Sequence, residues 1–156
     1  MTKEDKIYFT RRITQGNKSE IIVVLYDIYF SYGEDAYKAV DAGDSKGLAD
    51  AIRHMSEVAE HLKADLDFTY ELSAQLYPLY DYVQRCLAKA LYKMDADQIA
   101  AADRVMKELR EAFIEVAKQD ESGGQMVNAQ TVTAGYTYGR NSLSEITDGE
   151  NRGFFA

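Results

Sequence analysis

The chain has 156 residues, a length that suits one domain and can bury a core without disulfides or a metal. Its 46% hydrophobic and 28% charged residues are an ordinary soluble composition, and a net charge of −8 with no basic face argues against nucleic acid as a partner. No segment approaches the roughly 20 apolar residues of a membrane span, and the start, MTKEDKIYF, lacks the apolar core of a signal peptide. We therefore expect a cytoplasmic protein with no membrane insertion.

Residues 1–16 are expected to form a short lead-in with one apolar-aromatic cluster, Ile7, Tyr8 and Phe9. Helical patterning follows over about 17–119, after which the composition shifts to Gly, Thr, Asn and Ser. The sequence thus predicts a helical-bundle domain over 1–119 and an irregular or extended tail over 120–156.

Four helices are predicted within the patterned region. Their expected limits are Asn17 to about Gly43, Asp44 or Ser45 to about Asp67, Glu71 to Met94, and Asp95 to about Gln119. Asn17 and Glu20 have the spacing of a capping box, and aspartate and serine are good N-caps. Because the three connections are short, the fold class is all-α, with an antiparallel up-down-up-down four-helix bundle.

The second and fourth predicted helices each carry one clean apolar stripe, as expected for a helix that faces a single buried seam. The stripes consist of Leu48, Ile52, Met55, Ala59, Leu62 and Leu66, and of Ile99, Ala102, Met106, Leu109, Phe113 and Val116.

The first and third predicted helices have wider apolar surfaces. At about 100° per residue, each has an inward arc and a second arc beside it. The inward arcs include Leu25 and Ile28 on one helix, and Leu76, Leu79 and Tyr82 on the other. The second arcs consist of Val23, Tyr26, Phe30 and Tyr37, and of Tyr77, Tyr80, Leu87 and Leu91. In the Leu-Tyr-Asp triplet that both helices contain, leucine is thus expected in the core, tyrosine on the second arc, and aspartate in solvent.

Two interpretations of the second arcs remain open. They are ordinary packing, with the lead-in or tail covering one of them, or they form a partner site. Pro78 is a further oddity, because it lacks an N–H and crowds the carbonyl of Ala74. Either the third helix starts just before Pro78 or it bends there, and the helical spacing of Leu72 and Leu76 favours a bend.

No residue pattern points to an enzyme, a cofactor or a metal. His54, Glu57 and His61 have a spacing that metal ligands can use, but they lie nearly opposite the buried stripe and are expected to face solvent. Cys86 is the lone cysteine and falls on a helical core stripe, which favours packing over catalysis. No phosphate loop, nucleophile elbow or zinc spacing is found.

Four blocks of the sequence, in order, resemble the FliS family of flagellar export chaperones for flagellin. They are EIIVVLYD (20–27), IRHMSEVAEHLKADLDF (52–68), LYPLYDYV (76–83) and LREAF (109–113). The chain departs from the family pattern at Asn17-Lys18, where Ser-Pro is common, and at Ile28, where glycine is common. A glycine pair before the third helix is also missing, and the family's closing tryptophan is absent.

The resemblance implies a cytoplasmic chaperone that binds the C-terminal segment of flagellin, prevents premature polymerisation and keeps the cargo competent for export. The flagellar export apparatus is a further implied partner, and a monomer or weak dimer is expected. Contacts with the partner are predicted at the apolar arcs and the lead-in: Tyr8, Val23, Tyr26, Phe30, Tyr77, Tyr80, Leu87 and Leu91. Tyr26 and Tyr80 are alternatively structural, with hydroxyls bonded inside the bundle.

Two hypotheses concern the chain ends. Tyr8 with Phe9 caps an apolar site in the free protein and moves when cargo binds. The tail, which carries Tyr136, Tyr138, Phe154 and Phe155, is either a tethered competitor for the cargo or a recruiter of another component. The competing functional class is a self-associating or regulatory bundle that uses the same apolar faces on itself or on another protein.

Overall fold

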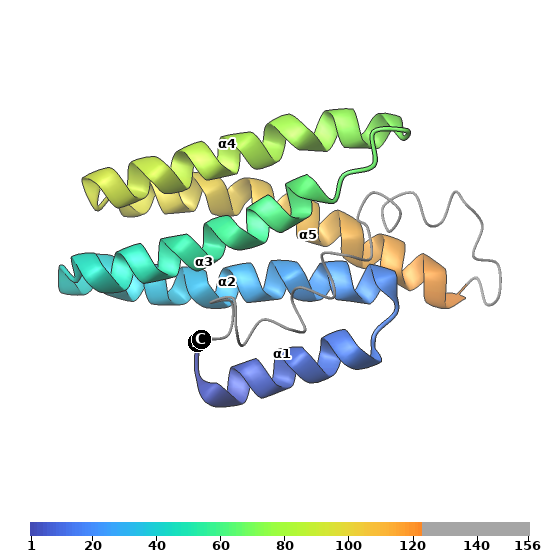
Figure 1. Cartoon of the computed structure of the whole chain (residues 1–156), viewed down its shortest axis with the longest axis horizontal. Coiled ribbons are helices and arrows are strands. Elements are labelled where there is room, and N and C mark those ends of the chain that lie inside the picture. Colours follow the sequence, from blue (N-terminus) through green and yellow to red (C-terminus); the bar gives the residue numbers. More distant parts are fainter. Residues whose placement is uncertain (123–156) are drawn as a thin grey trace.

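The computed structural model describes residues 1–122, and this part of the chain is entirely helical, with five helices and no strand (Figure 1). The helices are α1 (Lys3–Gln15), α2 (Lys18–Ala42), α3 (Ser45–Ala64), α4 (Glu71–Lys93) and α5 (Ala96–Ser122). The all-α fold class is therefore confirmed, but the expected number of four helices was wrong. The tail predicted over 120–156 lies, from residue 123, outside the described residues.

The extra helix is α1, which occupies the predicted lead-in. Its start is fixed by a capping box, in which the hydroxyl of Thr2 accepts a hydrogen bond from the Asp5 backbone and the Asp5 carboxylate accepts one from the Thr2 backbone. Only Phe9 and Ile13 are buried, one helical turn apart, whereas Ile7 is exposed. Two buried side chains are too few to give the periodicity on which the sequence prediction relied.

The predicted ends of α2 are confirmed. Asn17 and Glu20 form the expected reciprocal capping box. At the other end Gly43 adopts the left-handed conformation, with φ of 65°, and its N–H reaches carbonyls of the last turn. Asp44 caps α3 by accepting a hydrogen bond of 2.9 Å from the Gly47 backbone. The helix α3 then ends at Ala64, before the predicted limit.

Pro78 lies inside α4, which begins seven residues earlier at Glu71. The alternative in which the helix starts just before Pro78 was therefore wrong, and a bend remains the prediction that the missing N–H supports. The helix ends at Lys93, and the C-cap residue Met94 is left-handed with φ of 50° although it is not glycine.

The four long helices pack in a closed order, in which α2 and α4 each contact α3 and α5. The helix α1 packs against α2 on the side away from α4 (Figure 1). Both predicted single stripes face the core: all six residues of the α3 stripe are buried, while on the α5 stripe only Leu109 and Val116 are partly buried. Because α1 contacts α2, the helix α2 is enclosed on more sides than α4.

Candidate partner-binding surface

The tyrosines of the two Leu-Tyr-Asp triplets meet inside the bundle. Tyr26 on α2 and Tyr80 on α4 are fully buried, and their hydroxyls lie 2.6 Å apart, so that one donates a hydrogen bond to the other. The ring of Tyr26 also lies 5.7 Å from that of Phe113 on α5, measured between centroids. A buried tyrosine needs a partner for its hydroxyl, and each supplies it for the other across the bundle. This confirms the alternative in which Tyr26 and Tyr80 are structural, with their hydroxyls bonded inside the bundle.

The leucine of the second triplet is also displaced from its predicted place. Leu79 and Tyr82 were expected to face inward, but both are exposed, whereas Tyr80 and Val83 are buried. The buried side of α4 is thus rotated toward the residues that the sequence placed on its flank. On α2 the inward arc is confirmed, and the second arc is buried or packed against the core.

The two triplet aspartates bind basic side chains of neighbouring helices instead of facing solvent alone. Asp27 accepts from Arg12 of α1 at 2.5 Å and from Arg110 of α5 at 2.7 Å. Asp81 accepts from Lys63 of α3 at 3.1 Å. Asp27 therefore connects α2 to two helices, and Asp81 connects α4 to one. The position of each aspartate around its own helix could not show these contacts.

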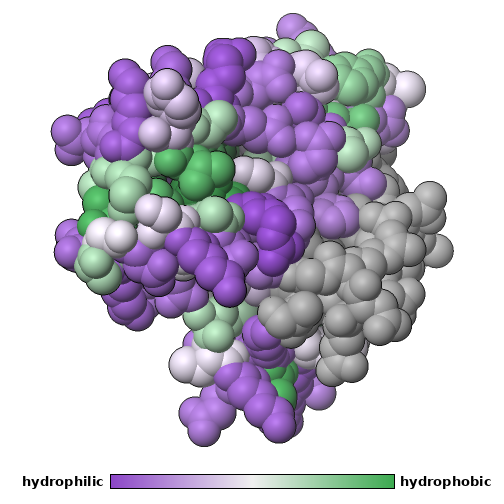
Figure 2. Space-filling model, turned by 60° about the vertical axis from the view of Figure 1, so that its left-hand side comes forward, coloured by the Kyte–Doolittle hydropathy of each residue, from purple (hydrophilic) through white to green (hydrophobic). Residues whose placement is uncertain are grey.

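The eight predicted contact residues fall into two groups. Tyr8, Tyr77 and Leu91 are exposed, with 56%, 39% and 41% of their surface accessible, and Phe30 is half-buried. The buried members are Val23, Tyr26, Tyr80 and Leu87. The exposed members do not form one patch, since Tyr77 and Leu91 are separated by about 21 Å along α4 at 1.5 Å per residue. Figure 2 likewise shows hydrophobic residues as small, separate patches on a largely hydrophilic face.

Further exposed apolar side chains were not predicted as contacts. Phe68 is 61% exposed and its ring lies 5.7 Å from that of Tyr77, while Tyr92 near the end of α4 is 88% exposed. Phe68 belongs to the connection between α3 and α4, so helical periodicity gave it no weight. Its place as a large apolar residue in an acidic connection, directly after Asp67, was the available signal.

The helix α1 covers part of the second arc of α2. Phe9 and Ile13 are buried, and Phe9 lines a shallow cavity together with Phe30 of α2. The Arg12–Asp27 ion pair and an ion pair between the amino terminus and Asp35 hold the two ends of α1 to α2. The structure therefore confirms that the lead-in covers part of one arc.

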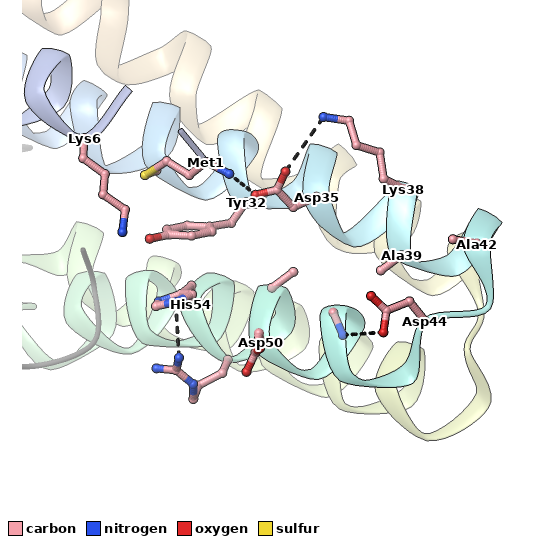
Figure 3. A pocket seen from close by; sticks show the side chains of 13 residues that line it. Met1, Lys6, Tyr32, Asp35, Lys38, Ala39, Ala42, Asp44, Asp50 and His54 are labelled. Atoms are coloured by element: carbon pink, nitrogen blue, oxygen red, sulfur yellow. Dashed lines mark hydrogen bonds and ion pairs between the residues drawn. The ribbon is translucent and has the colours of Figure 1, made fainter. Parts of the chain in front are cut away.

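On its other side, α1 meets α2 and α3 around a polar cavity of about 560 Å³ (Figure 3). Its walls carry charges of both signs, among them Lys6, Asp35 and Arg53. His54 lies here, buried and stacked on Tyr32 with ring centroids 4.2 Å apart, so its predicted exposure to solvent was wrong. Burial lowers the pKa of His54 and raises that of Tyr32 to about 12.

A second group of shifted residues ties α2 to α5. The Tyr37 hydroxyl donates a 2.8 Å hydrogen bond to Asp103, and burial raises the pKa of the Asp103 carboxyl. Burial also raises the pKa of Tyr29, which lies near the same carboxyl. These shifts follow from packing, since Tyr29 is buried and Asp103 is half-buried between two helices.

Within residues 1–122, no group of three or more His, Cys, Asp or Glu side chains is arranged to hold a metal ion. In the same part of the chain, no helix is long and apolar enough to cross a membrane. The exposed apolar side chains are the main candidate for a binding site in this small helical protein.

Comparison with known proteins assigns this helical chain to a family. The model of the family described as "Flagellar protein FliS" matches residues 1–120, which covers the five helices except the last two residues of α5. The chain belongs to the FliS family. A curated relative, the flagellar secretion chaperone FliS of Bacillus subtilis (strain 168), is 23% identical over 119 residues, which cover 74% of this chain and 90% of the relative.

Proposed function

We propose that this protein is a cytoplasmic flagellar secretion chaperone that binds the C-terminal segment of flagellin. The observation that carries the proposal is the family match over residues 1–120, together with a relative that is a flagellar secretion chaperone. The four long helices act as an antiparallel up-down-up-down scaffold, and the cargo segment wraps around it. The flagellar export apparatus is the proposed recipient of the complex.

The proposed mechanism is mass action without chemical turnover. A flexible segment that the chaperone holds is unavailable for polymerisation, and the held fraction depends on the chaperone concentration relative to Kd. The exposed apolar side chains on both ends of α4 and on α1 suit an extended or helical partner that contacts separate patches.

Four predicted contacts are proposed to touch the cargo directly: Tyr8, Phe30, Tyr77 and Leu91. The other four are proposed to support them from beneath, since they are buried: Val23, Tyr26, Tyr80 and Leu87. Substitution of the buried tyrosines would confuse binding with stability, so the exposed residues provide the sharper test.

The test is titration calorimetry of the full chain with a peptide of the flagellin C-terminal segment. Tyr77→Ala and Leu91→Ala are each expected to weaken binding about tenfold, because an aromatic or aliphatic anchor is worth more than about 1 kcal/mol. Lys89→Ala, an exposed change on the same helix, is the matched control and should bind like the parent. If the parent chain fails to bind the peptide, the proposed cargo is wrong.

We further propose that α1 shields part of the cargo site and leaves α2 when cargo binds. Arg12→Ala removes one of the two ion pairs at the ends of α1, and should tighten peptide binding severalfold by raising the fraction of binding-competent molecules. Arg11→Ala alters the exposed neighbour and is the control. Unchanged or weaker binding by Arg12→Ala would show that α1 does not compete with cargo.

Size measurement separates this function from the alternative of a self-associating bundle. A monomer or weak dimer that becomes a defined complex with the flagellin peptide supports the chaperone. A concentration-dependent homodimer that ignores the peptide supports the alternative.

A further inference from the structure

One patterned segment lies in the part of the chain that follows the family match, which ends at residue 120. In TAGYTYGRN (133–141), Tyr136, Tyr138 and Arg140 alternate with Thr137 and Gly139. In an extended chain, residues two apart share a side, so this spacing would place two aromatic rings and one guanidinium on one side, with small residues opposite. Over 123–144, Arg140 is the single charged residue, so this stretch carries a charge of +1.

The described surface offers a complementary patch at the start of α4. Phe68 and Tyr77 are both exposed, and their ring centroids lie 5.7 Å apart. The surrounding stretch DLDFTYE (65–71) holds three carboxylates and no basic residue. Lys63 lies 5.4 Å from the Tyr77 ring, but its charge is already paired with Glu60 at 3.2 Å and Asp81 at 3.1 Å. The patch is therefore aromatic at its centre and acidic at its edge.

The end of α5 lies at the same end of the molecule as the α3–α4 connection, which carries Phe68 (Figure 1). Only two residues connect α4 to α5, so α5 runs back along α4, and Ser122 lies at the same end of the molecule as the α3–α4 connection (Figure 1). Thirteen residues lie between Ser122 and Tyr136. The 14 steps from Ser122 to Tyr136 span at most about 46 Å, at about 3.3 Å per residue. This length is sufficient for the segment to reach the patch.

We propose that the segment Tyr136–Arg140 of the tail docks on the Phe68–Tyr77 patch of its own bundle, with the tyrosine rings against the exposed aromatic pair and Arg140 against the neighbouring carboxylates. A tethered segment acts at an effective concentration of about 1 mM, which is enough to occupy a site of weak intrinsic affinity. Arginine and tyrosine are the side chains that such contacts favour.

Docking would make the tail a competitor of the cargo, because Tyr77 is one of the proposed cargo contacts. This regulatory consequence rests on the proposed function, whereas the docking itself does not. The tail would then regulate cargo binding, although it lies outside the residues that match the family.

The docking is tested in the full chain with photo-reactive benzoylphenylalanine at position 138. After irradiation, mass spectrometry of the monomer is expected to find adducts within residues 63–81. Their yield should fall at least threefold when Phe68→Ala and Tyr77→Ala are combined, or when Arg140→Glu removes the cation. Tyr92→Ala, which alters an exposed ring near the other end of α4, should leave the yield unchanged. Adducts on α1, around Tyr92 or only between molecules would overturn the proposal.

Competition is tested by calorimetry with the flagellin C-terminal peptide. The combined Tyr136→Ala and Tyr138→Ala variant is expected to bind the peptide about three- to tenfold more tightly than the parent, as expected when a competitor near 1 mM is removed. Equal affinities would show that docking does not regulate cargo. If neither chain binds the peptide while the adducts are found at 63–81, the proposed function fails and the docking stands.

Discussion

The two Leu-Tyr-Asp triplets have the same residues but different surroundings. Leu25 of α2 is 1% exposed, whereas Leu79 of α4 is 37% exposed. The tyrosines Tyr26 and Tyr80 are both fully buried, and the side chain of Asp27 is 16% exposed against 36% for Asp81. The same local sequence is thus enclosed in one helix and partly open in the other.

The two helices also differ in the number of helices packed against them. Both α2 and α4 contact α3 and α5, but α2 is also covered by α1. The additional cover makes the flank of α2 part of the core, while the equivalent flank of α4 stays accessible. An apolar arc therefore becomes a candidate binding surface only where no other element of the chain covers it.

The largest expected contrast concerns the two leucines. Leu25→Ala should lower the free energy of unfolding by about 2–5 kcal/mol, because it removes buried methyl groups and leaves a cavity. Leu79→Ala should change it by less than about 1 kcal/mol, since the side chain is already partly in water. Urea unfolding followed by far-ultraviolet circular dichroism measures both, and equal losses would contradict the proposed difference in cover.

The aspartates should show a smaller contrast. Asp27→Asn should cost about 1.5–3 kcal/mol of unfolding free energy, since it breaks charge-assisted hydrogen bonds to Arg12 and Arg110. Asp81→Asn should cost about 0.2–1 kcal/mol, because its pair with Lys63 is more exposed. Urea unfolding at low and high salt checks this, and a loss at Asp81 that persists in high salt would mean that its pair is shielded from solvent.

The two tyrosines should lose similar amounts of stability, because their hydroxyls share one hydrogen bond. Tyr26→Phe and Tyr80→Phe should each lower the free energy of unfolding by about 1–3 kcal/mol, since either change removes the buried hydrogen bond between the two hydroxyls. The double variant should be more stable than the sum of the single losses predicts, which a double-mutant cycle detects. Additive losses would indicate that the two hydroxyls act independently.

The smallest effect is a pH dependence on the covered side of α2, where His54 stacks on Tyr32. The folded protein lowers the pKa of His54, mainly through burial, so the unfolded chain binds the proton more readily. Neutral His54 therefore contributes fully to stability above about pH 6.5, the pKa of histidine in the unfolded chain. This contribution falls as the pH drops toward the lower pKa that His54 has in the folded protein. Unfolding measured from pH 7 to 5 should show a steeper loss in the parent than in His54→Phe, which retains an aromatic ring. Identical slopes would exclude His54 as the source.

Some parts of this structure could be predicted from local patterns. The caps at Asn17, Gly43 and Asp44 and the stripe of α3 are confirmed, since a cap or a single buried seam depends on residues within one or two turns. The helix α1 was missed because Phe9 and Ile13 alone form no repeating pattern. Its capping box was present in the sequence, with Asp5 in place of the usual Glu or Gln.

The candidate surface was predicted less well than the fold. Tyr77 and Leu91 are exposed as a partner site requires, whereas Tyr80 and Leu87 are buried. All four lie on one apolar arc of α4, and the arc is wide enough to allow several rotations of the helix about its axis. In the observed rotation of α4, Tyr80 faces inward and pairs with Tyr26, which is 54 residues away in the sequence.

By itself the sequence determined the all-α fold class of the described residues, most helix limits and the single stripes of α3 and α5. These features follow from backbone hydrogen bonding and side-chain spacing within a segment. Only the tertiary structure decided which flanks are covered, which hydroxyls pair and which aspartates bind arginine. Those features depend on atoms that distant segments bring together: α1 on α2, Tyr26 on Tyr80, and Arg110 on Asp27. The position of a side chain on its own helix restricts which contacts it can make, and the neighbouring helices determine which of those contacts form.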